Sequence, residues 1–311
     1  MGRIRSAAHR LIARPSAARG MALVLIAAAA SGAMNVCVRH VAAEMHPFEA
    51  AFFRSLFGLL LLLPLTLHHG LRHLRTPRPV LHVIRGAIQA AVVLLTFTGL
   101  AMVPVAKVTA LQFTMPLFAA LLAIVFLGEP VHARRVAALV VGLGGALIIV
   151  RPGLVPLNVG SVLVLLSAAG VATLVIIVKM LGRTDSSLTI TLYMGLFTTP
   201  VTLLFAVPVW RNPSLAELGW LVVIGALTIV INLCFAQAVK EADATTLMPF
   251  DFTKLIWSAI IGYLFFAEVP TVWTWIGGFT IFASATYITY SESRFKKGSS
   301  VQDAAANRRE G

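Results

Sequence analysis

The sequence repeats itself at an offset of 139 residues. When the chain is aligned with itself without gaps, Gly86-Ala87 falls on Gly225-Ala226. Two longer matches place residues 111–114 on 250–253 and residues 126–129 on 265–268. The matching stretches are almost wholly apolar. A duplicated apolar unit constrains the fold strongly, because both copies carry the same series of hydrophobic segments and must bury them in the same way.

Composition places these segments in a membrane. The chain has 311 residues, of which 59% are hydrophobic and 12% charged, and its mean hydropathy is +0.90. A bilayer core needs about 20 apolar residues per helix. Ten stretches meet this need: 21–43, 48–67, 80–100, 104–127, 134–150, 158–180, 187–209, 215–237, 244–266 and 271–290. The predicted fold class is an all-α integral membrane protein with ten transmembrane helices.

The repeat divides the chain into two halves, at 21–151 and 158–291. Each half holds five predicted spans, an odd number, so the two copies must insert in opposite orientations. We therefore predict two antiparallel (inverted) five-helix repeats joined by the breaker-rich turn at 151–156. A basic tail at 1–20 and a polar tail at 292–311 complete the chain, and no room remains for a soluble domain.

The charge distribution predicts the orientation in the membrane. The formal net charge of +13 would suggest nucleic acid on a soluble protein, but topology accounts for it here. With a cytoplasmic N-terminus, the cytoplasmic segments hold eighteen basic residues and the opposite side holds only Arg39, Lys107, Arg151 and Arg211. We expect both termini in the cytoplasm, no nucleic-acid partner and a location in the cell inner membrane. Residues 1–20 also have a transit-peptide composition, but we expect an uncleaved tail.

Two stretches resemble the signatures of a known family. Residues 113–129, with the sequence FTMPLFAALLAIVFLGE, closely resemble the fourth-helix signature of EamA-type carriers in the drug/metabolite transporter superfamily. Residues 251–270, DFTKLIWSAIIGYLFFAEVP, followed by WIGG at 275–278, look like the matching signature of the second copy. The resemblance implies a ten-span secondary active transporter that moves an amino acid, vitamin, nucleoside-like compound or drug by alternating access. Export is favoured, and uptake of S-adenosylmethionine or a vitamin is the alternative.

No motif for covalent chemistry occurs in the sequence. It contains no GxSxG, Walker or HExxH motif, and Cys37 and Cys234 lie singly in apolar segments. We therefore expect no enzymatic activity, no catalytic residue, no metal and no cofactor. The expected partners are a small-molecule substrate and the lipid bilayer, and a homodimer stays open. An integral-membrane enzyme or a non-transporting scaffold is the alternative of another class, although the His-rich segment at 68–73 lacks accompanying carboxylates or cysteines.

Charged residues inside predicted spans mark the candidate site. A charge at the bilayer centre costs about 2.5–3.5 kcal/mol or more, so it normally meets a partner or a cavity. Asp251 and Lys254 lie three residues apart, on one helix face. The repeat places Gln112 on Asp251, and equivalent positions of antiparallel copies converge near the axis that relates them. Two interpretations stay open for Asp251 and Lys254: a substrate or proton site, and an ion pair that only packs the helices.

Other polar residues of the spans are predicted to surround this pair. The group consists of Asn35, Thr96, Gln237 and Arg54. Each of the uncharged residues could also form only a hydrogen bond between helices, which stabilises the packing by about 1 kcal/mol. Arg54 extends to the membrane interface, forms a structural pair, or reaches a cavity and meets an anionic substrate group.

Three further features concern structure. Pro116 and Pro249 lie within spans and are expected to bend them, as gates or as static kinks. Gly142, Gly144 and Gly145 allow a close backbone approach, which we assign to packing within the chain rather than to a dimer face. Glu129 and Glu268 end equivalent helices, where each is expected to cap the following helix.

Overall fold

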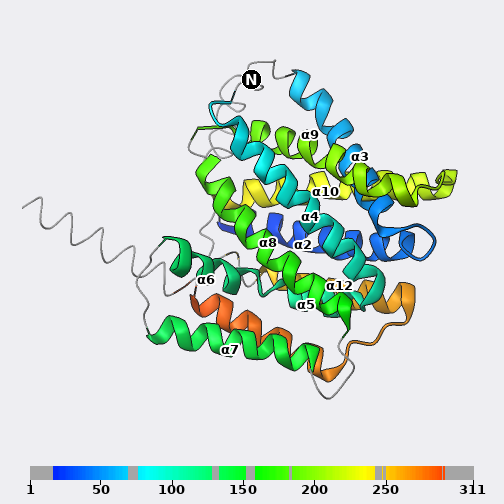
Figure 1. The fold of residues 1–311 in the computed structure, drawn as a ribbon. Coiled ribbons are helices and arrows are strands. Elements are labelled where there is room, and N and C mark those ends of the chain that lie inside the picture. The colour runs from blue at the N-terminus through cyan, green and yellow to red at the C-terminus, as the bar shows by residue number, and fades with distance from the viewer. Residues whose placement is uncertain are drawn as a thin grey trace, which may run out of the picture.

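The computed structural model describes residues 17–68, 76–127, 133–151, 158–181, 184–241, 247, 250–288 and 290, and its regular structure there is helical (Figure 1). The elements are α2 (Ala17–Val41), α3 (Pro47–His68), α4 (Pro79–Met102), α5 (Val105–Gln112), α6 (Met115–Leu127), α7 (Ala133–Val150), α8 (Val159–Leu181), α9 (Ser187–Ala206), the 3-10 turn η2 (Val207–Val209), α10 (Leu215–Glu241), α12 (Thr253–Phe266) and a helix over 272–288.

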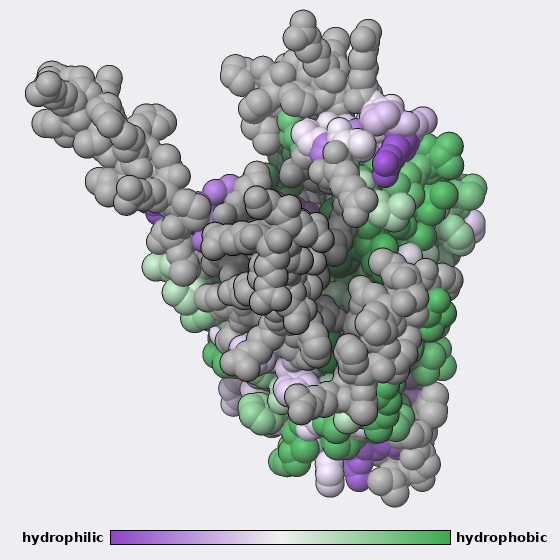
Figure 2. Space-filling model, turned by 90° about the vertical axis from the view of Figure 1, so that its left-hand side faces the viewer, coloured by the Kyte–Doolittle hydropathy of each residue, from purple (hydrophilic) through white to green (hydrophobic). Residues whose placement is uncertain are grey.

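The helices have the length and surface of membrane spans. Within the described residues, seven helices are long and apolar enough to cross a bilayer, and two shorter apolar helices cover Val136–Val150 and Thr253–Phe266. Large apolar side chains such as Leu204 and Leu264 are 71% exposed. Seen from the left-hand side of Figure 1, the described residues on the right-hand flank are mostly hydrophobic (Figure 2). Exposed apolar flanks on such helices indicate a multi-pass membrane protein.

The fourth span predicted at 104–127 is present as a candidate membrane span over Val105–Leu122, and it is broken within its length into α5 and α6. Helix α5 ends at Gln112, and α6 begins at Met115 after a turn at Phe113 and Thr114. Pro116 explains the break, because it has no N–H to donate to the carbonyl of Gln112 and its ring clashes with that carbonyl. At the same turn, the Thr114 hydroxyl donates to the Leu111 carbonyl, with an O···O distance of 2.7 Å.

The second copy interrupts its ninth span at the equivalent place. A turn at Phe252 precedes α12, and the Thr253 hydroxyl donates to the Phe250 carbonyl over 2.6 Å. These two residues are the equivalents of Thr114 and Leu111 at the offset of 139. Both copies therefore break the helix at equivalent residues, and in each a threonine hydroxyl donates to the carbonyl three residues earlier. Pro249 itself lies outside the described residues.

Helices of the two halves pack on one another in an exchanged pattern. Helix α2 packs on α10, and α4, the counterpart of α10, packs on α8, the counterpart of α2. Single residues repeat the exchange. The Ser284 hydroxyl donates to the Ala138 carbonyl, and their equivalents, Gly145 and Gly277, also touch. When two copies are related by a two-fold axis, a contact between two residues implies a second contact between their repeat counterparts. The exchanged contacts follow this pattern.

Small residues bring α7 and the helix over 272–288 into backbone contact. A Cβ at Gly277 would lie 2.5 Å from the Gly145 carbonyl oxygen, and one at Gly145 would lie 2.9 Å from the Gly277 oxygen. Figure 1 shows these helices side by side, in green and orange-red. Gly142 also packs within the chain, against Leu117, whereas a Cβ at Gly144 would have no neighbour within 4 Å among the described residues outside its own helical turn. The packing within the chain expected of Gly142 and Gly145 therefore occurs.

Candidate functional site

Two adjoining hollows form a central cavity between the halves. The first lobe has a volume of about 240 Å³ and the second lobe about 200 Å³. Thr109, Gln112, Val171 and Lys254 line both lobes, so the two lobes adjoin at these residues. Together they fall in the size range of sites for small metabolites, about 300–1,000 Å³.

Asp251 and Lys254 face the first lobe as an ion pair. The Lys254 Nζ lies 2.5 Å from the Asp251 Oδ1, and each side chain keeps about a quarter of its surface exposed, 26% and 25%. A separation of three residues brings the two side chains close enough to pair. The predicted pair is present although the turn at Phe252 lies between its two residues, and it remains accessible from the cavity.

The equivalent residues of the two copies meet at the same place. Gln112 lines the first lobe together with Asp251, its repeat counterpart. The next two residues, Phe113 and Phe252, are also counterparts, and their ring centroids are 5.2 Å apart. The expected convergence of these positions is therefore present in the structure. The aromatic pair lies directly beside the break in each helix, where the chain departs from regular helical geometry.

A buried polar group ties three helices together beside the cavity. The Asn35 amide donates to the Thr109 hydroxyl over 3.4 Å, and the Thr109 and Ser258 hydroxyls are 2.8 Å apart. All three side chains are buried, at 4%, 2% and 0% exposure. They belong to α2, α5 and α12. Thr109 lines the central cavity while Ser258 lines a different pocket, so this layer separates two hollows.

That different pocket surrounds Glu268. The Glu268 pocket has a volume of about 230 Å³ and includes Lys107 and Arg151. The Arg39 guanidinium lies 2.5 Å from the Glu268 carboxylate and also donates to the carbonyls of Leu100 and Val103. The other Glu268 oxygen accepts from the Val105 N–H over 3.0 Å. The expectation that Glu268 caps the following helix is therefore corrected: it caps the N-terminus of α5, where a carboxylate is favourable. Glu129 lies outside the described residues.

Arg54 is the second charged group of the cavity wall. It extends from α3 into the second lobe, which also contains Asn35, Gln89 and Thr96. Its guanidinium lies 5.8 Å from the centre of the Phe97 ring, a cation–π distance. The Nε is buried without a hydrogen-bond partner, and none of the described residues offers Arg54 an acceptor or a carboxylate. Of the two interpretations of Arg54, the structure places it at the cavity.

Gln237 is not brought into this group. Its side chain is exposed and donates to the Glu241 carboxylate over 3.0 Å, one turn further along α10. Its position among the cavity residues was inferred from span membership, which does not specify which face of a helix a residue occupies.

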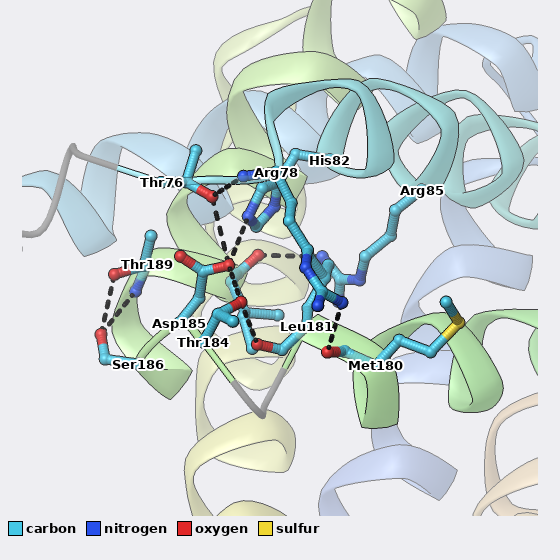
Figure 3. Close-up of polar contacts among 11 residues, drawn as sticks. Thr76, Arg78, His82, Arg85, Met180, Leu181, Thr184, Asp185, Ser186 and Thr189 are labelled. Carbon is cyan, nitrogen blue, oxygen red and sulfur yellow. Dashed lines mark hydrogen bonds and ion pairs between the residues drawn. The ribbon is translucent and has the colours of Figure 1, made fainter.

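A polar cluster that sequence reasoning missed lies between α4 and the turn before α9. The buried Asp185 carboxylate accepts from Thr76 and Thr184 over 3.1 Å each, and it lies 3.5 Å from the His82 Nε2 (Figure 3). Arg78, also in Figure 3, donates to the Met180 carbonyl. The signal in the sequence was a lone histidine in the first turn of an apolar helix, which has no meaning without its partner 103 positions away. Among the described residues, no group of three His, Cys, Asp or Glu side chains is arranged to hold a metal.

Comparison with known proteins agrees with this architecture. The model of the EamA-like transporter family matches residues 18–151 and again 158–290. The chain belongs to the EamA-like transporter family. A solved crystal structure covering 89% of the chain superposes with a TM-score of 0.61 at 17% identity, which shows a shared fold.

Curated relatives of this EamA-like chain are named as transporters of different compounds. An S-adenosylmethionine uptake transporter of Rickettsia felis is 32% identical, covering 88% of this chain and 94% of the relative. A riboflavin transporter of Brucella anthropi is 34% identical over 78% and 88% of the two chains. A pseudopaline exporter of Pseudomonas aeruginosa is 29% identical over 90% and 97%. The protein is thus a transporter of a small metabolite, and its relatives differ in substrate and in direction.

Proposed function

We propose that this protein is a secondary carrier built from ten spans in two inverted repeats, which moves its substrate by alternating access across a bacterial inner membrane. The observation that carries the proposal is the central cavity, where the counterparts Gln112 and Asp251 meet beside an ion pair. The exchanged contacts between the halves support an axis in the membrane plane. An inverted repeat makes the two sides of the membrane equivalent in design, so either half can close the cavity.

The polar clusters support an assignment of sides. Arg39, Lys107 and Arg151, three of the four basic residues expected outside, gather at the Glu268 pocket. The Asp185 cluster joins two segments expected inside. In this assignment the Arg39–Glu268 pair and the layer of Asn35, Thr109 and Ser258 close the outer side of the cavity. Substrate reaches Asp251 and Lys254 from one side and leaves after these contacts open.

The assignment of sides predicts the labelling of Val269. This residue lies just beyond α12 in the Glu268 pocket and is 74% exposed. In a variant without native cysteines, Val269→Cys should react in intact cells with a maleimide that does not cross the membrane. The same reagent should leave Thr76→Cys unmodified until the cells are opened. The reverse pattern would contradict the proposed topology.

The first substrate to test is S-adenosylmethionine, because the relative named for its uptake covers most of both chains. The purified protein should accelerate entry of radiolabelled S-adenosylmethionine into proteoliposomes above the rate in empty vesicles. Loading the compound inside and measuring its release tests export, the direction that the pseudopaline relative favours. A pH gradient imposed in either direction tests proton coupling. Riboflavin and S-adenosylmethionine both moving no faster than in empty vesicles would contradict these two substrate assignments.

A further inference from the structure

We propose that the second lobe is a subsite for a carboxylate, held by Arg54, and that the substrate is a zwitterion whose amine is held at Asp251. The inference rests on the proposed function, since it names the substrate class of the same cavity. It goes beyond the names of the relatives, which include compounds with and without a carboxylate.

The first argument is the unsatisfied state of Arg54. Two other arginines of the described helices donate hydrogen bonds. Arg85, whose Nε is also buried without a partner, donates from its Nη1 to the Ile190 carbonyl over 2.9 Å, and Arg39 donates to two carbonyls and pairs with Glu268. Arg54 has only the face of Phe97, and its Nε is buried without an acceptor. A cation in the membrane interior is tolerated when it meets a partner or a cavity. The guanidinium fork matches a carboxylate, which can accept two parallel hydrogen bonds from it.

The second argument is the charge of the cavity wall. Among the described residues that line the two lobes, the groups charged at neutral pH are Arg54, Lys254 and Asp251. Asp251 neutralises Lys254, which leaves one positive charge on the wall, at Arg54. A ligand carboxylate gives the Arg54 cation a counter-charge, and the amine of a zwitterion meets its own at Asp251, so the summed charge of the cavity stays the same while Arg54 gains a partner. Asn35, Gln89 and Thr96 line the same lobe and can complete the hydrogen bonds of the carboxylate.

The third argument is that the two lobes adjoin at the ion pair. Lys254 lines both lobes, so a ligand that joins them passes directly beside the ion pair. A substrate amine can then replace the Lys254 ammonium at Asp251, which exchanges one ion pair for another. The released Lys254 can turn toward the carboxylate already at Arg54. Phe113 and Phe282 line the first lobe and offer aromatic faces to the remainder of the substrate.

A binding experiment separates this inference from transport. The full chain, purified in detergent, is titrated with S-adenosylmethionine, with its decarboxylated form, with methionine and with methionine methyl ester. Binding is followed by equilibrium dialysis with radiolabelled compounds and by the shift in unfolding temperature. We expect at least one of the two carboxylates to bind about 30-fold more tightly than its matched compound without one, the scale of a buried charge pair.

Variants then assign the preference to Arg54. Arg54→Met should remove the preference for the carboxylate, and Arg54→Lys, which keeps the charge, should restore part of it. Arg85→Met is the matched control, because Arg85 is a buried arginine that lines neither lobe. It should keep the preference even if its unfolding temperature falls. Since the comparison of ligands is first made on the unaltered protein, it does not depend on the folding of any variant.

The outcomes distinguish the two proposals. Equal binding of matched compounds, no binding of either carboxylate, or a preference unchanged in Arg54→Met would overturn the carboxylate subsite. Carboxylate-dependent binding without flux in proteoliposomes would contradict the proposed carrier function and leave the subsite in place. Equal flux of S-adenosylmethionine and its decarboxylated form would contradict the carboxylate subsite and leave the carrier function in place.

Discussion

Asp251→Asn should lower the transport rate at least about 30-fold while the protein still folds and inserts. The change keeps the shape of the side chain and removes the charge that pairs with Lys254 at 2.5 Å. The amine of a substrate then has no carboxylate to meet, and Lys254 has no counter-charge in the cavity. Losing one member of a charge pair at a binding site typically costs about 2–5 kcal/mol, which corresponds to this loss of rate or more. Initial rates in proteoliposomes measure the effect.

The double variant Asp251→Asn with Lys254→Met decides between the two interpretations of the pair. Removing both charges eliminates the unpaired lysine, so the variant should recover any stability lost in Asp251→Asn. If the pair only packs the helices, transport should recover with stability. If the pair holds substrate, transport should stay low. Full activity in the double variant would reduce Asp251 and Lys254 to a structural ion pair.

Gly277→Ala should lower the free energy of unfolding by about 2 kcal/mol, within the range of overpacked cores. The added Cβ would lie 2.5 Å from the Gly145 carbonyl oxygen and 2.5 Å from the Ile149 Cγ1. A backbone oxygen cannot turn away as the end of a flexible side chain can, so the two helices must separate. Separation also weakens the hydrogen bond from Ser284 to Ala138 on the same pair of helices. Thermal unfolding in detergent, compared with the unaltered protein, gives the measurement.

Gly144→Ala is the matched control for this effect. Gly144 lies one residue from Gly145 on α7, but a Cβ there would have no neighbour within 4 Å. The substitution should leave stability unchanged or raise it by up to about 1 kcal/mol through helix propensity. Equal stability of Gly277→Ala and Gly144→Ala would show that the close approach of the two helices is not needed.

Much of the candidate cavity could be predicted from linear features. Asp251 and Lys254 stand out because charges are rare in apolar spans, and their spacing specifies a shared face. Gln112 follows from the repeat, since equivalent positions meet where two copies face each other. Gln237 did not follow, because a polar residue in a span has several faces on which to lie. The sequence predicted a bend at Pro116 in the fourth span, but the turn at Phe113 and Thr114 that divides the span into α5 and α6 is visible only in the structure.

Apolar length, charge asymmetry and internal repetition are properties of the chain itself, and they already specified a helical membrane protein of two related halves. The partners of Arg54, Glu268 and Asp185 could come only from packing. Glu268 caps a helix that begins 163 positions earlier, and Asp185 pairs with a histidine 103 positions earlier. Among the described residues, Arg54 faces a cavity and not a carboxylate of the chain. Such contacts depend on which helix faces meet in space, and the period of a single helix does not contain that information.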